Sequence, residues 1–239
     1  MKINSFDISQ CKARQLNVTM EHNEIKNDSE WVRGSPIPAF FKNTIGFKPC
    51  KVVVLVKGKD RDEILENRSN ILSRLLEPTT LTLDGFDHKF YGILTKHSIT
   101  EDSIKRFHRL TLEFSGCEID DEIPSSFSST TTFTVENPGN IITPAIIEIT
   151  PQIGISTLTI SGLCRDPETG EGQDITIREL STGKKIVIDG ELGLMTEEGA
   201  NKFKDIDLWE LPTLLPGANN ITCSTKNIAV AIRFRPRFM

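Results

Sequence analysis

The 239-residue sequence has none of the long hydrophobic runs that mark membrane-spanning or secreted proteins. Its longest apolar runs, Val52–Val56 and Ile228–Ile232, are far shorter than the roughly 20 residues that a membrane helix needs. The first ten residues also lack the apolar core of a secretory signal peptide. We therefore expect no membrane insertion and no secretion signal.

Paired cysteines are missing as well. The sequence has five cysteines, an odd number, and no CxxC motif occurs among them. This pattern predicts reduced, mostly buried thiols in a protein that folds in a cytoplasm. The residues are Cys11, Cys50, Cys117, Cys164 and Cys223.

A surplus of positive charge is absent too. The formal net charge is −5. Neither half of the chain, divided near residue 136, carries more basic than acidic residues. Neither half therefore has the overall charge of a dedicated nucleic-acid binder.

Motifs with known chemistry are also lacking. The four histidines do not follow HExxH or HxH spacing. Gly170 and Gly172 have no third glycine to complete a dinucleotide loop, and no phosphate-binding GxxxxGK[ST] loop occurs. We therefore expect no catalytic residue, no resident metal, no cofactor and no enzymatic activity.

One acidic loop invites a metal-binding interpretation. The segment Asp166–Asp174 holds four carboxylates, which are the ligands that calcium prefers. The twelfth position of an EF-hand count is Ile177, where a bidentate glutamate is required. We interpret the segment as a solvated hairpin loop.

The first half predicts β structure with a single helix. Lys51–Val56 is an unbroken apolar strand, expected to be buried on both faces. The segment Asp60–Leu76 has helical spacing of its apolar residues, with Asp60 and Glu63 as a capping box. Pro78 ends this helix, because proline has no amide proton.

Two hairpins follow the helix. Leu81–Leu83 and Phe90–Leu94 flank an Asp-Gly pair that favours a tight turn. A second pair, Thr95–Ile99 with Arg109–Phe114, is expected to turn near Glu101 and Asp102.

The segment Glu21–Pro49 has no regular pattern but several large aromatic residues. Two interpretations stand: an arm that packs on another molecule, or a loop folded over its own core. With the Leu81–Ile99 hairpins it supplies the candidate subunit contacts: Trp31, Phe40, Phe41, Phe47, Phe86 and Tyr91.

The second half is expected to be almost entirely β. The Ser/Thr-rich segment Pro124–Thr132 is the candidate linker, although its threonines also suit an edge strand. Short strands separated by Gly and Pro turns then predict a sandwich or barrel. Ile221–Cys223 and Ile228–Phe234 would form the closing hairpin. The sequence thus predicts a mainly β fold with two domains, residues 1–132 and 133–239.

Three arginines near the C-terminus alternate along the chain. On one strand, Arg233, Arg235 and Arg237 would share a face. They would contact an acidic partner or face a channel that carries DNA. The alternative is a polar outer face on the last strand.

The order of these elements resembles the distal tail (Dit) family of long-tailed bacteriophages. The segments that carry the resemblance are Lys51–Val56 with the helix, Phe90–Leu94, Leu110–Cys117, and Leu208–Ile221 followed by Ile228–Arg233. Family members often have Asp-Pro after the cysteine-containing strand, whereas Glu118 and Ile119 stand here.

The resemblance implies two β-sandwich domains, the first with the helix and a hairpin arm, the second galectin-like. It implies a hexameric hub ring in the virion tail, assembled in the host cytoplasm. The ring would join the tail tube protein to the tail-associated lysin or fibre protein, would often hold receptor-binding proteins, and would let DNA pass. The competing function is a carbohydrate-binding module, and the scarcity of aromatic residues in the second half weakens it.

Overall fold

The computed structural model describes residues 1–31, 33–101, 106–166 and 169–239, apart from the side chains of Lys42 and Asn43. The chain divides into two compact units, Met1–Ile119 (unit 1) and Asp120–Phe238 (unit 2). Strands dominate both units, which confirms the mainly β fold class. No helix among the described residues has the length and apolar character needed to cross a bilayer.

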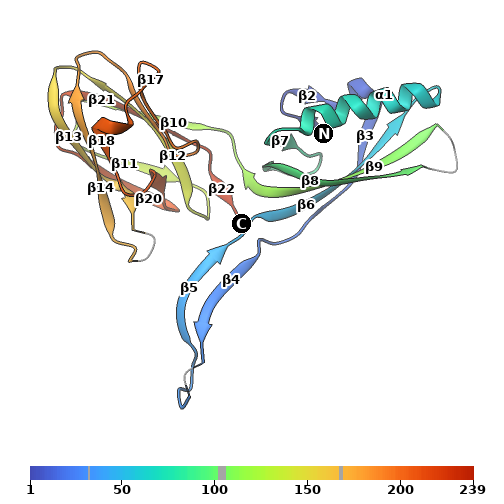
Figure 1. Ribbon diagram of the computed structural model, residues 1–239, viewed down its shortest axis with the longest axis horizontal. Helices are drawn as coiled ribbons and strands as arrows, with labels where there is room; N and C mark the ends of the chain where they lie inside the picture. The colour runs from blue at the N-terminus through green and yellow to red at the C-terminus, as the bar shows by residue number, and fades with distance from the viewer. Residues whose placement is uncertain (32, 102–105, 167–168) are drawn as a thin grey trace. The chain divides into compact units, whose positions relative to one another are not determined.

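Unit 1 is built on one antiparallel sheet with the strand order β2-β1-β7-β8-β9-β6-β3. Figure 1 shows helix α1 (Arg61–Leu72) lying along this sheet. The strands are β1 (Lys2–Ile3), β2 (Phe6–Asp7), β3 (Ala13–Met20), β6 (Lys48–Lys57), β7 (Thr79–Thr82), β8 (Lys89–Glu101) and β9 (Phe107–Ile119). Two 3₁₀ turns, η1 (Ile8–Cys11) and η2 (Ser73–Leu75), complete the unit.

Strand β8 is one long strand where the sequence predicted two. Its register against β9 shifts at Thr95, so a bulge and not a turn separates the two expected segments. The expected turn residue Asp102 lies outside the described residues.

Two glycines face each other where β8 and β9 pair, at Gly92 and Gly116. A Cβ atom added to Gly116 would lie 2.1 Å from the carbonyl oxygen of Tyr91. The backbones therefore approach too closely for any side chain at this position. This constraint accounts for the glycines in two of the segments that carry the family resemblance.

Helix α1 begins where the sequence predicts. The Asp60 carboxylate accepts a hydrogen bond from the Glu63 amide at 2.9 Å, which satisfies an amide that lacks a helical partner. The Glu63 carboxylate accepts from the amide of Lys59, one residue earlier than in a capping box. The α-helix ends at Leu72, four residues before the predicted end at Leu76. The 3₁₀ turn η2 follows it directly.

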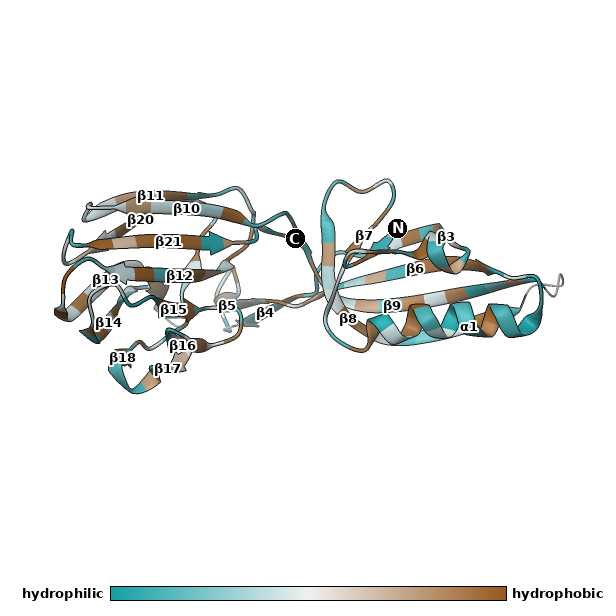
Figure 2. Ribbon diagram, turned by 90° about the horizontal axis from the view of Figure 1, so that it is seen from above, coloured by the Kyte–Doolittle hydropathy of each residue, from teal (hydrophilic) through white to brown (hydrophobic). Residues whose placement is uncertain are grey.

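The core of unit 1 lies between the sheet and α1. Ile64 and Ile71 of α1 are fully buried against valines of β6 and leucines of β9. Figure 2 shows that α1 carries both hydrophobic and hydrophilic segments, as a helix does when only one stripe is buried. Leu76, expected in this stripe, is 84% exposed because it follows η2 and no longer shares the helical face.

A second sheet in unit 1 contains only β4 (Ile25–Glu30) and β5 (Ala39–Ile45). Figure 1 shows these strands as a two-stranded ribbon, and we call residues Ile25–Ile45 the arm hairpin. The sequence predicted an irregular segment here, because Gly34, Pro36 and Pro38 interrupt its pattern. The structure instead pairs two strands whose register shifts at Phe41.

Unit 2 is a sandwich of two antiparallel sheets with the orders β10-β21-β12-β15-β16-β17 and β11-β20-β13-β14-β18. The first sheet contains β10 (Ile123–Ser128), β12 (Thr143–Pro151), β15 (Ile186–Asp189), β16 (Leu194–Glu197), β17 (Ala200–Asn201) and β21 (Ile228–Phe234). The second contains β11 (Thr132–Asn137), β13 (Ile155–Arg165), β14 (Gly172–Leu180), β18 (Ile206–Asp207) and β20 (Gly217–Cys223). The short elements are η3 (Phe203–Asp205), β19 (Thr213–Leu214) and β22 (Arg237–Phe238).

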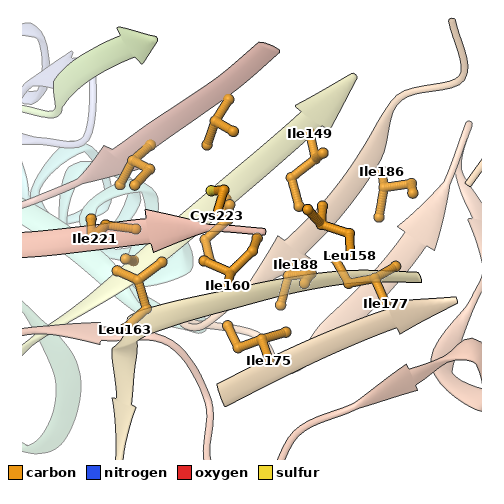
Figure 3. Close-up of a cluster of buried hydrophobic side chains, with 14 of the residues drawn as sticks. Ile149, Leu158, Ile160, Leu163, Ile175, Ile177, Ile186, Ile188, Ile221 and Cys223 are labelled. Carbon is orange, nitrogen blue, oxygen red and sulfur yellow. The ribbon is translucent and has the colours of Figure 1, made fainter. Parts of the chain in front are cut away.

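Apolar side chains from both sheets meet between them. Figure 3 shows Ile149 and Ile188 of the first sheet near Leu158, Ile160 and Ile177 of the second. All five are fully buried. Burial of each such side chain contributes about 1.5–3 kcal/mol, so these contacts hold the two sheets of unit 2 together.

Two sequence predictions need correction in unit 2. The boundary between units lies at residue 119, earlier than the predicted 132, because most of the expected linker forms β10 and pairs with β21. The expected closing hairpin does not exist, because β20 and β21 belong to different sheets. The alternation of residues 221–234 is correct for two strands, but alternation does not identify their partners.

Candidate assembly surface

The arm hairpin is fixed at its base by backbone and side-chain hydrogen bonds. The amide of Gly46 donates to the carbonyl of Glu24 at 2.7 Å, and the Asn23 side chain donates to the carbonyl of Gly46 at 2.9 Å. The amide of Glu21 donates to the carbonyl of Pro49 at 3.1 Å. The hairpin thus starts from a defined position beside the first residues of β6, although its strands pair only with each other among the described strands.

Large apolar side chains on and beside this hairpin are exposed. Trp31, Phe40, Phe41 and Phe47 are each between 59% and 70% exposed. Of the two interpretations of this segment, the structure excludes a loop folded over its own core. An aromatic side chain with this exposure gains about 1.5–3 kcal/mol when a partner buries it.

The register of the hairpin separates its two faces. Ile25 lies opposite Ile45, and Ser29 lies opposite Phe40, on one face. Lys26, Asp28 and Glu30 alternate with them and occupy the other face. The face that carries Ile25, Ile45 and Phe40 also carries the pair Asn27–Asn43, and no core covers its apolar residues.

Sequence reasoning missed part of this surface. Ile25, Ile37 and Ile45 are also exposed, and none was a predicted contact residue. The sequence carries little signal for them, because Ile25 and Ile45 stand among polar residues such as Lys26 and Asn27, and neither strand alternates apolar and polar residues.

The other two predicted contact residues lie elsewhere in unit 1. Phe86 is 38% exposed in the β7–β8 turn, which Gly85 closes with a positive φ of 86°. Tyr91 is half-buried on β8, opposite Thr80 and Cys117. The structure therefore places four of the six predicted aromatics on or beside the arm hairpin and two on a different hairpin.

The three predicted arginines do not share one strand. Strand β21 ends at Phe234, and Pro236, which has no amide proton, separates Arg235 from Arg237 in β22. Arg237 forms an ion pair with Glu191 at 3.5 Å. Arg233 lies 2.6 Å from Glu148 and 3.3 Å from Glu122. The charges of Arg233 and Arg237 are thus partly neutralised within unit 2.

Glu148 is the centre of this charge network. Burial alone would raise its pKa, but hydrogen bonds from Lys185 and Arg233 outweigh burial and hold the pKa of Glu148 below its ordinary value. It borders a hollow of about 220 Å³ over β10, β12 and β21, lined also by Ser126, Ser128 and Thr150. A carboxylate held between two cations is a poor general base.

Buried thiols are equally unsuited to catalysis. All five cysteines are free and buried, as the sequence predicts. Burial raises the pKa of Cys50 and of Cys164 to about 12, so neither supplies a thiolate near neutral pH.

Within the described part of the chain, no three His, Cys, Asp or Glu side chains gather where they could hold a metal. In the acidic loop of residues 166–174, Pro167 and Glu168 lie outside the described residues. Asp166 accepts a hydrogen bond from the amide of Thr169 at 3.2 Å, which is typical of a turn.

Comparison with known proteins gives matches at the level of structure alone. No protein-family model and no curated protein matches the sequence. A crystal structure of the SPP1 Dit protein, described as a paradigm of the hub adsorption apparatus in phages that infect Gram-positive bacteria, covers 100% of this chain and 98% of its own. Its TM-score is 0.74 and its identity is 12%.

Two structures of the phage P2 baseplate in its activated conformation also match. One, with Ca, covers 97% of this chain and 92% of that chain, with a TM-score of 0.60 and 10% identity. The other, with Sr, covers 96% and 92%, also with a TM-score of 0.60 and 10% identity. The fold inferred from the sequence is confirmed: this chain has the fold of a phage baseplate hub protein of the Dit type.

Proposed function

We propose that the protein is a structural, non-enzymatic component of a bacteriophage tail tip. Copies would form a hexameric ring that joins the tail tube protein to a tail-associated lysin or fibre protein and holds receptor-binding proteins. The similarity of fold to hub and baseplate proteins supports this proposal. The observation that carries it is the group of exposed large apolar side chains on the arm hairpin.

Apolar exposure of this kind favours assembly for a physical reason. A single exposed leucine is ordinary, but clustered large apolar side chains on one short hairpin mark an interaction site. A ring requires contacts between different surfaces of adjacent copies, closing after six steps. The arm hairpin is one such surface, and Phe86 and Tyr91 are candidates on another hairpin.

Light scattering after size-exclusion chromatography tests the ring. We expect a species of six times 26.7 kDa at high protein concentration. The double variant Phe40→Ser/Phe41→Ser should remove it, because both side chains are exposed and their replacement leaves the core of unit 1 intact. Ile153→Ser/Leu192→Ser changes two exposed side chains of unit 2 and is the matched control. A hexamer that survives the hairpin variant contradicts the proposed contact.

A second function, carbohydrate binding by unit 2, is favoured by one observation. Trp209 is 79% exposed and Phe203 is 64% exposed, while Phe133 and Phe234 are buried in the core. Exposed aromatic rings stack on sugar faces, and carboxylates bond sugar hydroxyls. Asp205, Asp207 and Glu210 stand in the same short segment as the two exposed aromatics.

Calorimetry with soluble cell-wall polysaccharide separates the two functions. Sugar binding predicts heat that Trp209→Ala abolishes and that Trp31→Ala, an exposed tryptophan of unit 1, leaves unchanged. No heat with any polysaccharide, together with a hexamer in solution, would leave assembly as the function.

A further inference from the structure

A polar hollow of about 370 Å³ lies in unit 1 where η2 follows helix α1. One wall is the turn between β1 and β2, residues 3–6, and the other is the segment from η2 to β7, residues 73–79. Two hydrogen bonds join the walls: the amide of Asn4 donates to the carbonyl of Thr80 at 2.7 Å, and the Asn4 side chain accepts from the Thr80 amide at 2.9 Å. The two walls are therefore fixed to each other, and we call this site the η2 hollow.

Arg74 gives the η2 hollow a fixed cation. Its guanidinium carbon lies 3.8 Å from the centre of the Phe6 ring. Such stacking restricts the plane of the guanidinium but leaves the N–H donors at its edge available. In the part of the chain that the structure describes, no carboxylate pairs with Arg74. A carboxylate from outside the unit can therefore bind it in the bidentate geometry that a guanidinium favours.

An exposed leucine and an exposed acid stand beside this cation in the wall of the hollow. Leu76 is 84% exposed, so a partner that covers it gains from its burial. Glu77 is exposed too, and it forms no ion pair with any described residue. The hollow therefore offers one cation, one large apolar side chain and one anion within four residues.

The tip of the arm hairpin carries complementary groups within four residues. Glu30 ends β4, Trp31 follows it, and Arg33 stands at the turn beside Gly34, whose φ is 90°. Trp31 is 65% exposed. Neither Glu30 nor Arg33 forms an ion pair with a residue that the structure describes. We call Glu30, Trp31 and Arg33 the arm tip.

We propose that the arm tip of one copy of this chain docks in the η2 hollow of the next copy. Glu30 would accept hydrogen bonds from Arg74, and Arg33 would pair with Glu77. Both ion pairs form in only one orientation of the arm, because the reverse orientation brings like charges together. This inference rests on the proposed function, in which copies assemble into a ring, and it assigns the surface that receives the arm.

The indole of Trp31 would lie between the two ion pairs, against Leu76. A tryptophan that fills a hollow and is surrounded by polar contacts has the composition of an interface hot spot. The arm tip and the η2 hollow are different surfaces, so each contact leaves one free tip and one free hollow for further copies. A contact of this kind extends from copy to copy until a ring closes.

Exchange of two charges tests the docking, by light scattering over a series of protein concentrations. Arg74→Glu and Glu30→Arg should each raise the concentration at which half of the chains are assembled by about tenfold or more, because each brings like charges together. The double variant Glu30→Arg/Arg74→Glu restores the ion pair in the opposite sense and should recover most of this loss. Lys226→Glu makes the same change of charge at an exposed position of unit 2 and is the matched control.

Two results of this exchange would overturn the docking. One is assembly of both single variants at the same concentration as the wild-type protein. The other is a double variant that assembles no better than the single variants while its thermal unfolding is unchanged.

Cysteine trapping tests the same contact without a change of charge. Copies with Trp31→Cys, mixed with copies with Leu76→Cys, should form disulfide-linked dimers under mild oxidation. Either variant alone should not, since the native cysteines are all buried. A chain that carries both substitutions should give a series of linked oligomers up to the hexamer. A disulfide within a single chain would show that the arm folds onto its own hollow, and it would overturn the docking.

The two experiments also separate this proposal from the ring itself. A wild-type hexamer that tolerates the charge changes and gives no linked dimers refutes only the docking. Linked dimers without any hexamer refute only the ring.

Discussion

The arm hairpin and the sandwich of unit 2 both pair apolar residues across neighbouring strands, with opposite results. In unit 2, the apolar face of each sheet meets the apolar face of the other, and isoleucines such as Ile147 and Ile160 are fully buried. In the arm hairpin, Ile25 and Ile45 face each other across the strands but remain about half exposed. A single hairpin has no second layer to cover such a pair. Cross-strand apolar pairs thus occur in both places, and only a second layer makes them part of a core.

The largest expected difference in stability is between a buried ion pair of unit 1 and an exposed ion pair at the arm hairpin. Lys48 and Glu118 form an ion pair in unit 1, with side chains 6% and 15% exposed. Lys48→Met should cost about 3–5 kcal/mol, because it leaves a carboxylate without a cation. Hydrogen exchange resolved by peptide measures the destabilisation within unit 1. Glu118→Leu in the same background should recover most of it, and Lys26→Met, at an exposed pair of the hairpin, should cost less than about 1 kcal/mol. Equal costs at both pairs would refute the contrast.

Truncation of a buried isoleucine is expected to give the next-largest loss of stability. Ile147→Ala should destabilise unit 2 by about 2–5 kcal/mol, because it opens a cavity between the sheets. Ile25→Ala should change the stability of the isolated protein by less than about 0.5 kcal/mol. Urea denaturation followed by hydrogen exchange of each unit reports both values. If Ile25→Ala were as costly as Ile147→Ala in a monomer, the hairpin would have to pack on its own chain.

The helix cap has a smaller effect. Asp60→Ala should destabilise unit 1 by about 1 kcal/mol, because the Glu63 amide loses its acceptor. Asp60→Asn retains an acceptor and should cost less. Faster hydrogen exchange in the first turn of α1, with β8 and β9 unchanged, is the expected signature. A uniform destabilisation across unit 1 would mean that Asp60 does more than cap.

The charge network of unit 2 gives the smallest effect, and it depends on pH. Because hydrogen bonds from Lys185 and Arg233 hold the pKa of Glu148 below its ordinary value of 4.5, the charged form stabilises the folded state. This contribution is complete above the unfolded pKa and is lost as pH falls through the lower folded pKa. Glu148→Gln should thus cost less than about 1 kcal/mol near neutral pH and nothing at strongly acidic pH, as thermal unfolding across pH would measure. If the stability cost of Glu148→Gln grew as the pH fell, this prediction would be wrong.

Most of the fold could be predicted from local sequence patterns. The helix follows from Asp60, the apolar spacing and Pro78, and the strand around Val54 follows from its unbroken apolar run. These signals are local, because they depend on neighbours within one turn or one strand. The partners of β20 and β21 were not predictable in this way, since the register of each strand is set by residues far away in the chain.

The candidate surface was only partly predictable. Aromatic residues such as Phe40 and Trp31 drew attention by their size, whereas Ile25 and Ile45 have significance only through their cross-strand pairing. Only the register brings such residues onto one face.

The position of β21 also determines when each part of the protein can mature. This strand, residues 228–234, lies between β10 and β12 and pairs with both, so the first sheet of unit 2 has a gap until the ribosome has released it. Strands β1 to β9 of unit 1 have all been made once residue 119 has been added, and early folding of amino-terminal units is common during synthesis. A nascent chain would therefore carry strands β1 to β9, with the arm already formed, before unit 2 receives the strand that joins β10 to β12.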